Sequence, residues 1–224
     1  MPLPRRALLA APFATPLAVR HAPGHDPAGE PAGGPARAAV PHAVRTDIYL
    51  VEGRTRREVQ ASIRARGPGG EGGKTYAGRT EWRVDWASAT LAAPGGVTLR
   101  GFDVFVQVRH TLPRWDRPAV VGAGTVRAWD RYLAALTAHE RGHAEIGLDA
   151  AAAMLAALTP ALAAPPAAGA TPPPAAWTEP TAAALAARLD ARCERILEVA
   201  RAKELDYDRV TAHGLRKPPA GWGE

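Results

Sequence analysis

The sequence predicts an α+β fold in which a small antiparallel sheet and one short helix accompany two long helices packed together. Two segments around the turn Pro94-Gly95-Gly96 alternate apolar and charged residues, as expected for a half-buried β-hairpin. Two later segments, about 125–158 and 178–212, repeat apolar residues every three or four positions, which is the period of an amphipathic helix. The 224 residues therefore favour one domain of ordinary size with tails.

The first part of the chain combines a signal-like start with a segment poorly suited to folding. Arg5 and Arg6 precede an uncharged apolar stretch, residues 7–19, which resembles the start of a signal peptide. Residues 20–45 are mainly Pro, Gly and Ala and have little to bury. We therefore expect a secreted or periplasmic protein with no integral membrane span. The expected parts are an N-terminal tail (1–45), a folded domain (46–214) and a C-terminal tail (215–224).

The N-terminal half of the predicted domain contains the sheet and the short helix. Thr55 and Glu58 form a capping-box pattern at the start of that helix. Pro113 should end pairing of the last strand, whose edge is a candidate surface for an extended peptide. The expected elements are strands at 47–53, 80–86 and 97–110 and a helix at 56–66.

The two long helices form the C-terminal half. Thr125 is a candidate N-cap for the first of them. A Pro/Ala-rich linker, residues 160–176, separates it from the second helix, which Thr178 and Pro180 should start. Gly214 is placed to terminate the second helix.

The most informative motif is His139-Glu140-Arg141-Gly142-His143, an H-E-x-x-H sequence within the first long helix. Because the histidines are four residues apart, both imidazoles lie on one helix face, one turn apart. That face is also the apolar stripe of the helix, where an unpaired polar group is costly. Two such rings can bind one tetrahedral zinc ion, and Glu140 can take a proton from a water on the metal.

A catalytic zinc site needs a third protein ligand beside the two histidines. Glu145 lies two residues past His143, on the wrong side of the helix. Asp149 would suit a longer H-E-x-x-H-x-x-G-x-x-[HD] pattern, but this sequence has Ile146 where that pattern needs a chain-turning glycine. His213 reaches the site if the two long helices pack antiparallel, although it could instead interact only with the helix C-terminus. The spacing alone leaves Asp149 and His213 open.

Charge and cysteine content argue against several other kinds of protein. The formal charge is +6, yet the arginines are scattered among acidic residues, so nucleic acid is not an expected partner. Cys193 is the only cysteine, which excludes an intrachain disulfide and a cysteine-based zinc cluster. It falls on the apolar stripe of the last helix, where we expect a small buried hydrophobe.

Several segments together resemble a bacterial family of domains of unknown function that is described as predicted secreted zinc-dependent proteases. The matching segments are 49–53, 76–82, 111–115, 129–143 and 207–214. The resemblance spans about residues 45–214, and the H-E-x-G-H helix is its most specific part. It implies a metallopeptidase-like site on a zincin-like metal helix and an exported protein. It also implies His213 rather than Asp149 as third ligand, because His213 lies within a matching segment.

We therefore expect a zinc-dependent metallopeptidase that hydrolyses a peptide or protein substrate. His139, His143 and His213 would bind Zn²⁺, and Glu140 would act as general base on the metal-activated water. Tyr207 is a candidate for stabilising the oxyanion, although a core tyrosine fits its position on the helix stripe better.

The sequence also allows other roles for some residues and other functions for the protein. We interpret Asp208 as a solvated helix charge in preference to a residue that orients a histidine, and His110 as an ordinary strand histidine. One alternative function is a zinc hydrolase of a non-protein amide in the cell envelope. Another is a non-catalytic binding or scaffold module that keeps the fold. No feature of the sequence indicates the oligomeric state.

Overall fold

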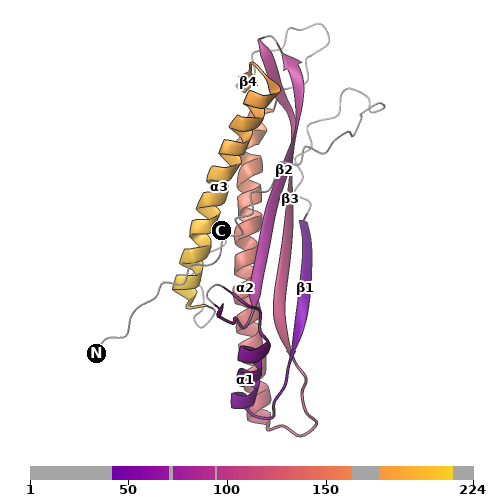
Figure 1. Ribbon diagram of the computed structural model, residues 1–224, viewed down its shortest axis with the longest axis vertical. Helices are drawn as coiled ribbons and strands as arrows, with labels where there is room; N and C mark the ends of the chain where they lie inside the picture. The colour runs from indigo at the N-terminus through magenta and orange to yellow at the C-terminus, as the bar shows by residue number, and fades with distance from the viewer. Residues whose placement is uncertain (1–41, 71–72, 94, 163–176, 214–224) are drawn as a thin grey trace, which may run out of the picture.

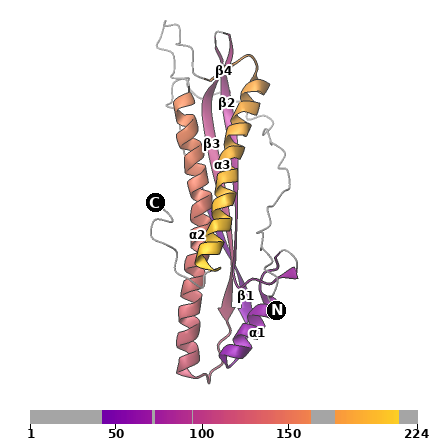
Figure 2. The ribbon, with the colours of Figure 1, turned by 90° about the vertical axis from the view of Figure 1, so that its left-hand side faces the viewer.

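The computed structural model describes residues 42–70, 73–93, 95–162 and 177–213. Two long helices, α2 (Ala123–Leu158) and α3 (Ala182–Thr211), lie side by side along one face of an elongated sheet (Figures 1 and 2). The α+β class expected from the sequence is confirmed. The signal-like start, most of the Pro/Ala linker and the C-terminal tail lie outside the described residues.

The sheet has the strand order β1-β3-β2, and a short fourth strand, β4, pairs with β3. β2 and β3 form the expected antiparallel hairpin. β1 runs parallel to β3, so the sheet is mixed rather than purely antiparallel. The strands are β1 (His42–Val51), β2 (Arg79–Ala93), β3 (Gly96–Trp115) and β4 (Thr178–Glu179).

Several local boundaries differ from the sequence expectations. β1 begins at His42, within the segment expected to be tail. β3 continues through Pro113 and pairs there with β1 alone, so this proline does not end the strand. Thr178 belongs to β4, and α3 starts later, where the Thr181 side chain accepts a hydrogen bond from the backbone of the first turn. Near His110, β3 pairs with β1 on one side and with β2 on the other, so this part of the strand has no open edge for a peptide.

Capping explains why the short helix begins where the sequence predicts. α1 (Arg56–Arg66) has Thr55 as N-cap and a complete capping box with Glu58, as expected. The N-cap of α2 is Gly122 rather than Thr125, and a glycine has no side chain that could cap the helix. The long α2 helix thus depends on its buried face more than on its cap.

The main core lies between the sheet and the two long helices. Val104, Val106 and Val108 of β3 are at most 2% exposed, as their alternation with polar residues predicts. From α3, Cys193 is fully buried in the same cluster, which confirms the expectation of a small buried hydrophobe. The remaining core residues of the long helices include Ile146, Ala150, Ala151, Met154, Leu158, Leu185, Leu189, Leu197 and Ala200.

By length and composition, the segment Ala123–Ala161 would also suffice to cross a bilayer. Its inward face, however, packs in the core, where Met154 and Leu158 have no exposed surface. A core helix of a folded domain meets the same criterion, so length and composition alone do not make α2 a membrane span.

Candidate metal centre

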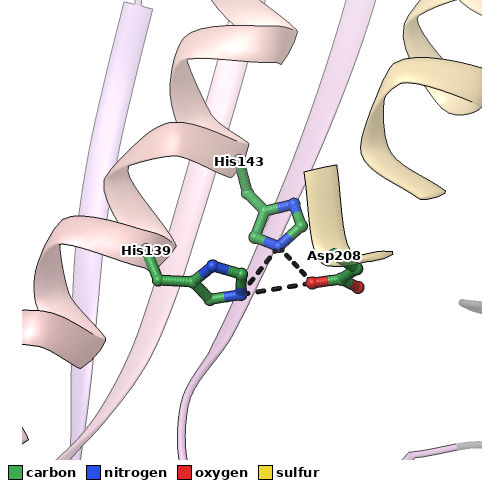
Figure 3. A group of neighbouring side chains, drawn as sticks. All are labelled: His139, His143 and Asp208. Atoms are coloured by element: carbon green, nitrogen blue, oxygen red, sulfur yellow. Dashed lines mark hydrogen bonds and ion pairs between the residues drawn. The ribbon is translucent and has the colours of Figure 1, made fainter. Parts of the chain in front are cut away.

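The helices α2 and α3 bring three potential metal-ligand atoms together. His139 Nε2 and His143 Nε2 lie 3.3 Å apart, and Asp208 Oδ1 lies 3.2 Å and 3.1 Å from them. Figure 3 shows the two imidazoles reaching from α2 toward the carboxylate of α3. In a tetrahedral site with ligand distances near 2.0–2.1 Å, neighbouring ligand atoms are about 3.3 Å apart. The triangle formed by these atoms therefore has the size that one zinc ion requires.

Each helix contributes to the site through residues one turn apart. His139 and His143 follow each other on the buried face of α2, where they are 6% and 9% exposed. On α3, Glu204 and Asp208 have the same four-residue spacing. His143 meets Glu204 and Asp208, whereas His139 meets Asp208 and Thr211, so the two helices run antiparallel here.

The hydroxyl of Thr211 determines which ring nitrogen of His139 carries the proton. Thr211 Oγ1 donates a hydrogen bond to the Tyr207 carbonyl at 2.6 Å. Since a threonine hydroxyl has only one proton, its 3.2 Å contact with His139 Nδ1 requires that nitrogen to be the donor. The Nε2 atom of neutral His139 then has a lone pair directed at the cluster.

Carboxylates flank His143 on both sides of its ring. Its Nδ1 atom lies 3.4 Å from Glu204 Oε1, and its Nε2 atom lies 3.1 Å from Asp208 Oδ1. Burial would lower the pKa of His143, but its contacts with Asp208 and Glu204 outweigh burial and raise the pKa to about 10. Burial would likewise raise the pKa of Asp208, yet its contacts with both histidines hold that pKa well below its usual range.

Glu140 is buried beside the cluster and is fixed from the sheet. Its side chain accepts a hydrogen bond at Oε2 from Thr80 Oγ1 of β2 at 2.7 Å. Burial raises the pKa of Glu140, and the Thr80 bond opposes that shift. A Cβ atom at Gly78 would lie 2.7 Å from Glu140 Oε1, so a larger residue at this position would displace the carboxylate. His110 is linked to the same group, because its Nδ1 lies 2.9 Å from Thr80 Oγ1.

Tyr207 forms one wall of the cluster. Its ring stacks on His139 with centroids 5.1 Å apart and meets His143 edge-on. It is only 2% exposed. Gly142 of the motif makes this packing possible, because a Cβ there would lie 2.1 Å from the Tyr207 hydroxyl oxygen. This position is that of a core tyrosine, and an action of its hydroxyl on a substrate stays a prediction.

The third position of the cluster is occupied by Asp208, where the sequence led us to expect His213. α3 ends at Thr211, and the left-handed residues Ala212 (φ 48°) and His213 (φ 54°) turn the chain. His213 remains half exposed, with its Nδ1 3.4 Å from Asp208 Oδ1. The structure thus places His213 next to the third residue of the cluster. Asp149, the other candidate, is exposed on α2.

The interpretation of Asp208 as a solvated helix charge is wrong. Its side chain is 22% exposed and contacts three histidines. A signal was present in the sequence, because Glu204 and Asp208 continue the steps of three or four residues of the buried stripe that contains Cys193, Leu197 and Ala200. Acidic residues on the inward stripe of one helix match the histidines on the inward stripe of the other.

The fold and the cluster together define an α+β protein with a candidate His-His-Asp metal centre between two long antiparallel helices. The chain belongs to the family "Bacterial protein of unknown function (DUF922)", whose model matches residues 46–214. That range includes every residue of the cluster. No curated protein and no solved structure matched the chain.

Proposed function

We propose that the protein is a zinc-dependent metallopeptidase with His139, His143 and Asp208 as zinc ligands and Glu140 as general base. The proposal depends on one observation: three ligand atoms 3.1, 3.2 and 3.3 Å apart stand beside a buried glutamate that belongs to the same helix turn as the histidines. Three protein ligands leave a fourth tetrahedral position for water or substrate, which is the pattern of catalytic rather than structural zinc sites.

The donor chemistry supports zinc at this place. A zinc ion would displace the extra proton that the raised pKa of His143 keeps on its ring in the metal-free protein. The resulting set of two neutral imidazoles and one carboxylate is common for catalytic zinc. The ring nitrogens of His139 and His143 that face away from the cluster contact Thr211 and Glu204, the kind of outer partner that metal-binding histidines have. When bound, a divalent cation supplies Lewis-acid polarisation of a carbonyl group and lowers the pKa of a coordinated water.

Glu140 performs the proton transfers in this proposal. Thr80 engages Oε2, so we assign Oε1 as the oxygen that accepts a proton from the attacking water. The same carboxyl group then gives that proton to the amine nitrogen of the departing peptide. Burial raises the pKa of Glu140, which brings a carboxylate closer to the basicity that a general base needs near neutral pH.

We further propose a peptide or protein as substrate, met outside the cytoplasm. The signal-like residues 7–19 and the resemblance to predicted secreted proteases support this location. The substrate assignment follows from the H-E-x-x-H motif on a helix, which is typical of metallopeptidases.

Metal analysis combined with one conservative substitution tests the proposal. Purified protein should contain about one zinc per chain and should cleave members of a mixture of synthetic peptides of diverse sequence. Glu140→Gln should keep the zinc and lose hydrolysis by roughly 10²- to 10⁴-fold, as expected for loss of a general base. Glu145→Gln, an exposed change on the same helix, should behave like the wild type.

Three results would contradict the proposal. One is a protein that takes up no zinc. Another is iron in its place, because two histidines and a carboxylate also form the facial triad of non-haem iron oxygenases. The third is zinc binding without any metal-dependent cleavage, which is the behaviour of a binding module.

A further inference from the structure

Two tryptophans of β2 donate indole hydrogen bonds to acidic residues of α3. Trp82 Nε1 donates to Glu204 Oε1 at 2.7 Å, and Trp86 Nε1 donates to Asp190 Oδ1 at 2.9 Å. The two bonds are alike in chemistry and in the elements that they join. They differ in the other contacts of the acidic acceptor, because Glu204 Oε1 also lies 3.4 Å from His143 Nδ1. Asp190 precedes that level of α3 by several turns, roughly 20 Å along the helix.

Trp82 also sets how closely β2 approaches α2. A Cβ atom at Gly147 would lie 2.7 Å from Trp82 Cγ, so the indole packs directly on the backbone of α2. Gly147 is one turn after His143, and Glu204 is one turn before Asp208. A single indole therefore touches both metal-site helices, each within one turn of a candidate ligand.

We propose that Trp82 and Glu204 are positioning residues that hold His143 in its metal-binding orientation, so that the sheet sets the affinity of a site formed by the helices. This inference rests on the metal centre proposed above. Ionised Glu204 can only accept hydrogen bonds. Its Oε1 atom, held by the indole, therefore favours the His143 tautomer with the proton on Nδ1. That tautomer leaves Nε2 as the ligand atom, facing His139 Nε2 and Asp208 Oδ1.

The pair of tryptophans provides a matched test. Trp82→Phe and Trp86→Phe each remove one indole donor from the same strand and keep an aromatic ring. We would measure zinc dissociation constants of metal-free protein by competition with a chromophoric chelator. Outer partners of metal-binding histidines typically contribute about 10- to 100-fold in affinity. We expect Trp82→Phe to weaken zinc binding about tenfold and Trp86→Phe to change it by less than about twofold.

Substitutions at Glu204 distinguish its effect on the orientation of His143 from the effect of packing of the Trp82 ring. Glu204→Gln keeps the shape and an acceptor oxygen, so it should weaken zinc binding less than Glu204→Ala, which should approach the upper end of that range, about 100-fold. Nuclear magnetic resonance of ¹⁵N-labelled histidines adds a direct signature. In the zinc-loaded wild type, His143 should have its proton on Nδ1, and exchange of that proton with water should become faster in Glu204→Ala.

The outcomes distinguish this inference from the metal centre on which it rests. Equal zinc affinities of Trp82→Phe and Trp86→Phe, with Glu204→Ala also unchanged, would overturn the positioning role and leave the metal centre standing. A wild-type protein that binds no zinc would overturn both. If Trp82→Phe did not fold, Glu204→Gln and Glu204→Ala would decide the question, because they leave the Trp82 ring packed against Gly147.

Discussion

Asp208 points toward buried histidines, whereas the charged residues beside it in the sequence lie near the surface. Asp206 and Arg209, on either side, pair with each other near the surface. Asp208 instead contacts His139 and His143 at 3.2 Å and 3.1 Å. A carboxylate removed from water is costly unless it is paired, so these contacts account for an acidic residue on the inward side of α3.

Substitutions at Asp208, His213 and Asp149 should show, through their effects on zinc affinity, which of these residues is the third ligand. Asp208→Asn should weaken zinc binding by more than about 100-fold, because loss of a ligand exceeds the effect of losing an outer partner. His213→Ala should have a smaller effect, since its ring lies against Asp208, and Asp149→Asn should have none. Isothermal titration with zinc measures all three. A larger loss in His213→Ala than in Asp208→Asn would restore His213 as the third ligand.

Part of the candidate site could be predicted from the sequence because it is local. The positions of His139, Glu140 and His143 on one helix follow from helix geometry alone. Asp208 and Glu204 belong to another helix, and their role depends on which face of α3 meets α2. That choice is made by packing of the whole stripe, so an acidic residue on it is easily interpreted as solvated.

At the scale of elements, the close approach of α2 and α3 depends on a glycine inside the motif. Gly142 is a poor residue for a helix interior, where glycine is about 1 kcal/mol less favourable than alanine. Its place is explained by Tyr207, whose hydroxyl oxygen would lie 2.1 Å from an added Cβ. The sequence thus gives up helix propensity to let the two helices meet at the cluster.

Two glycine substitutions in α2 should therefore have opposite effects. Gly142→Ala should destabilise the protein by about 1–3 kcal/mol through overpacking against Tyr207. Gly124→Ala, in the first turn of the same helix, should be neutral or stabilising, because the nearest atom to its Cβ is Arg56 Nη2 at 4.0 Å. Urea unfolding of both variants checks this. A Gly142→Ala variant as stable as the wild type would show that α2 and α3 do not approach as closely as described.

The elements that the sequence predicts well are those whose signals are short in range. The capping box of Thr55 and Glu58 places the start of α1 at the correct residue. The parallel pairing of β1 with β3 has no such signal, because it joins segments more than 60 residues apart, from His42↔Val106 to Val51↔Trp115. The threonine-proline context of Thr178 is typical of a helix start, whereas its pairing with Thr98 makes it part of β4.

At the scale of the whole molecule, the reactivity of the Cys193 thiol shows whether the core is folded as described. Cys193 is fully buried between the helices and the sheet, and burial raises its pKa to about 12. Thiolate is the reactive form of cysteine. Thiol reagents at pH 8 should therefore label the native protein far more slowly than the urea-unfolded protein. Rapid labelling of the native protein would contradict the described core.

The raised pKa of Cys193 also predicts that the stability of the protein depends on pH. The unfolded state ionises its cysteine near the ordinary value of 9.0, while the folded state holds the proton until about pH 12. The unfolded state therefore binds fewer protons over this window, and stability falls as pH rises. Cys193 should contribute a loss of about 1 kcal/mol by pH 10. Unfolding measured between pH 7.5 and 10 should show a steeper decline in the wild type than in Cys193→Ala, and equal slopes would contradict this.

A cation between α2 and α3 should also join the two helices and stabilise the whole fold. Binding to the native state alone adds about 2.7 kcal/mol when free zinc exceeds its dissociation constant 100-fold. Thermal unfolding of metal-free protein should accordingly move to higher temperature on addition of zinc. Asp208→Asn should show little or no such shift at the same zinc concentration. A wild-type protein whose unfolding temperature ignores zinc would contradict a site shared by the two helices.

We propose that α2 and α3 together bind one zinc ion through His139, His143 and Asp208. The most direct measurement is anomalous X-ray diffraction at the zinc edge from crystals of the zinc-loaded protein. We predict one peak at about 2.0–2.2 Å from His139 Nε2, His143 Nε2 and Asp208 Oδ1. The absence of a peak between the two helices, or a peak that His213 ligates while Asp208 does not, would contradict this zinc site.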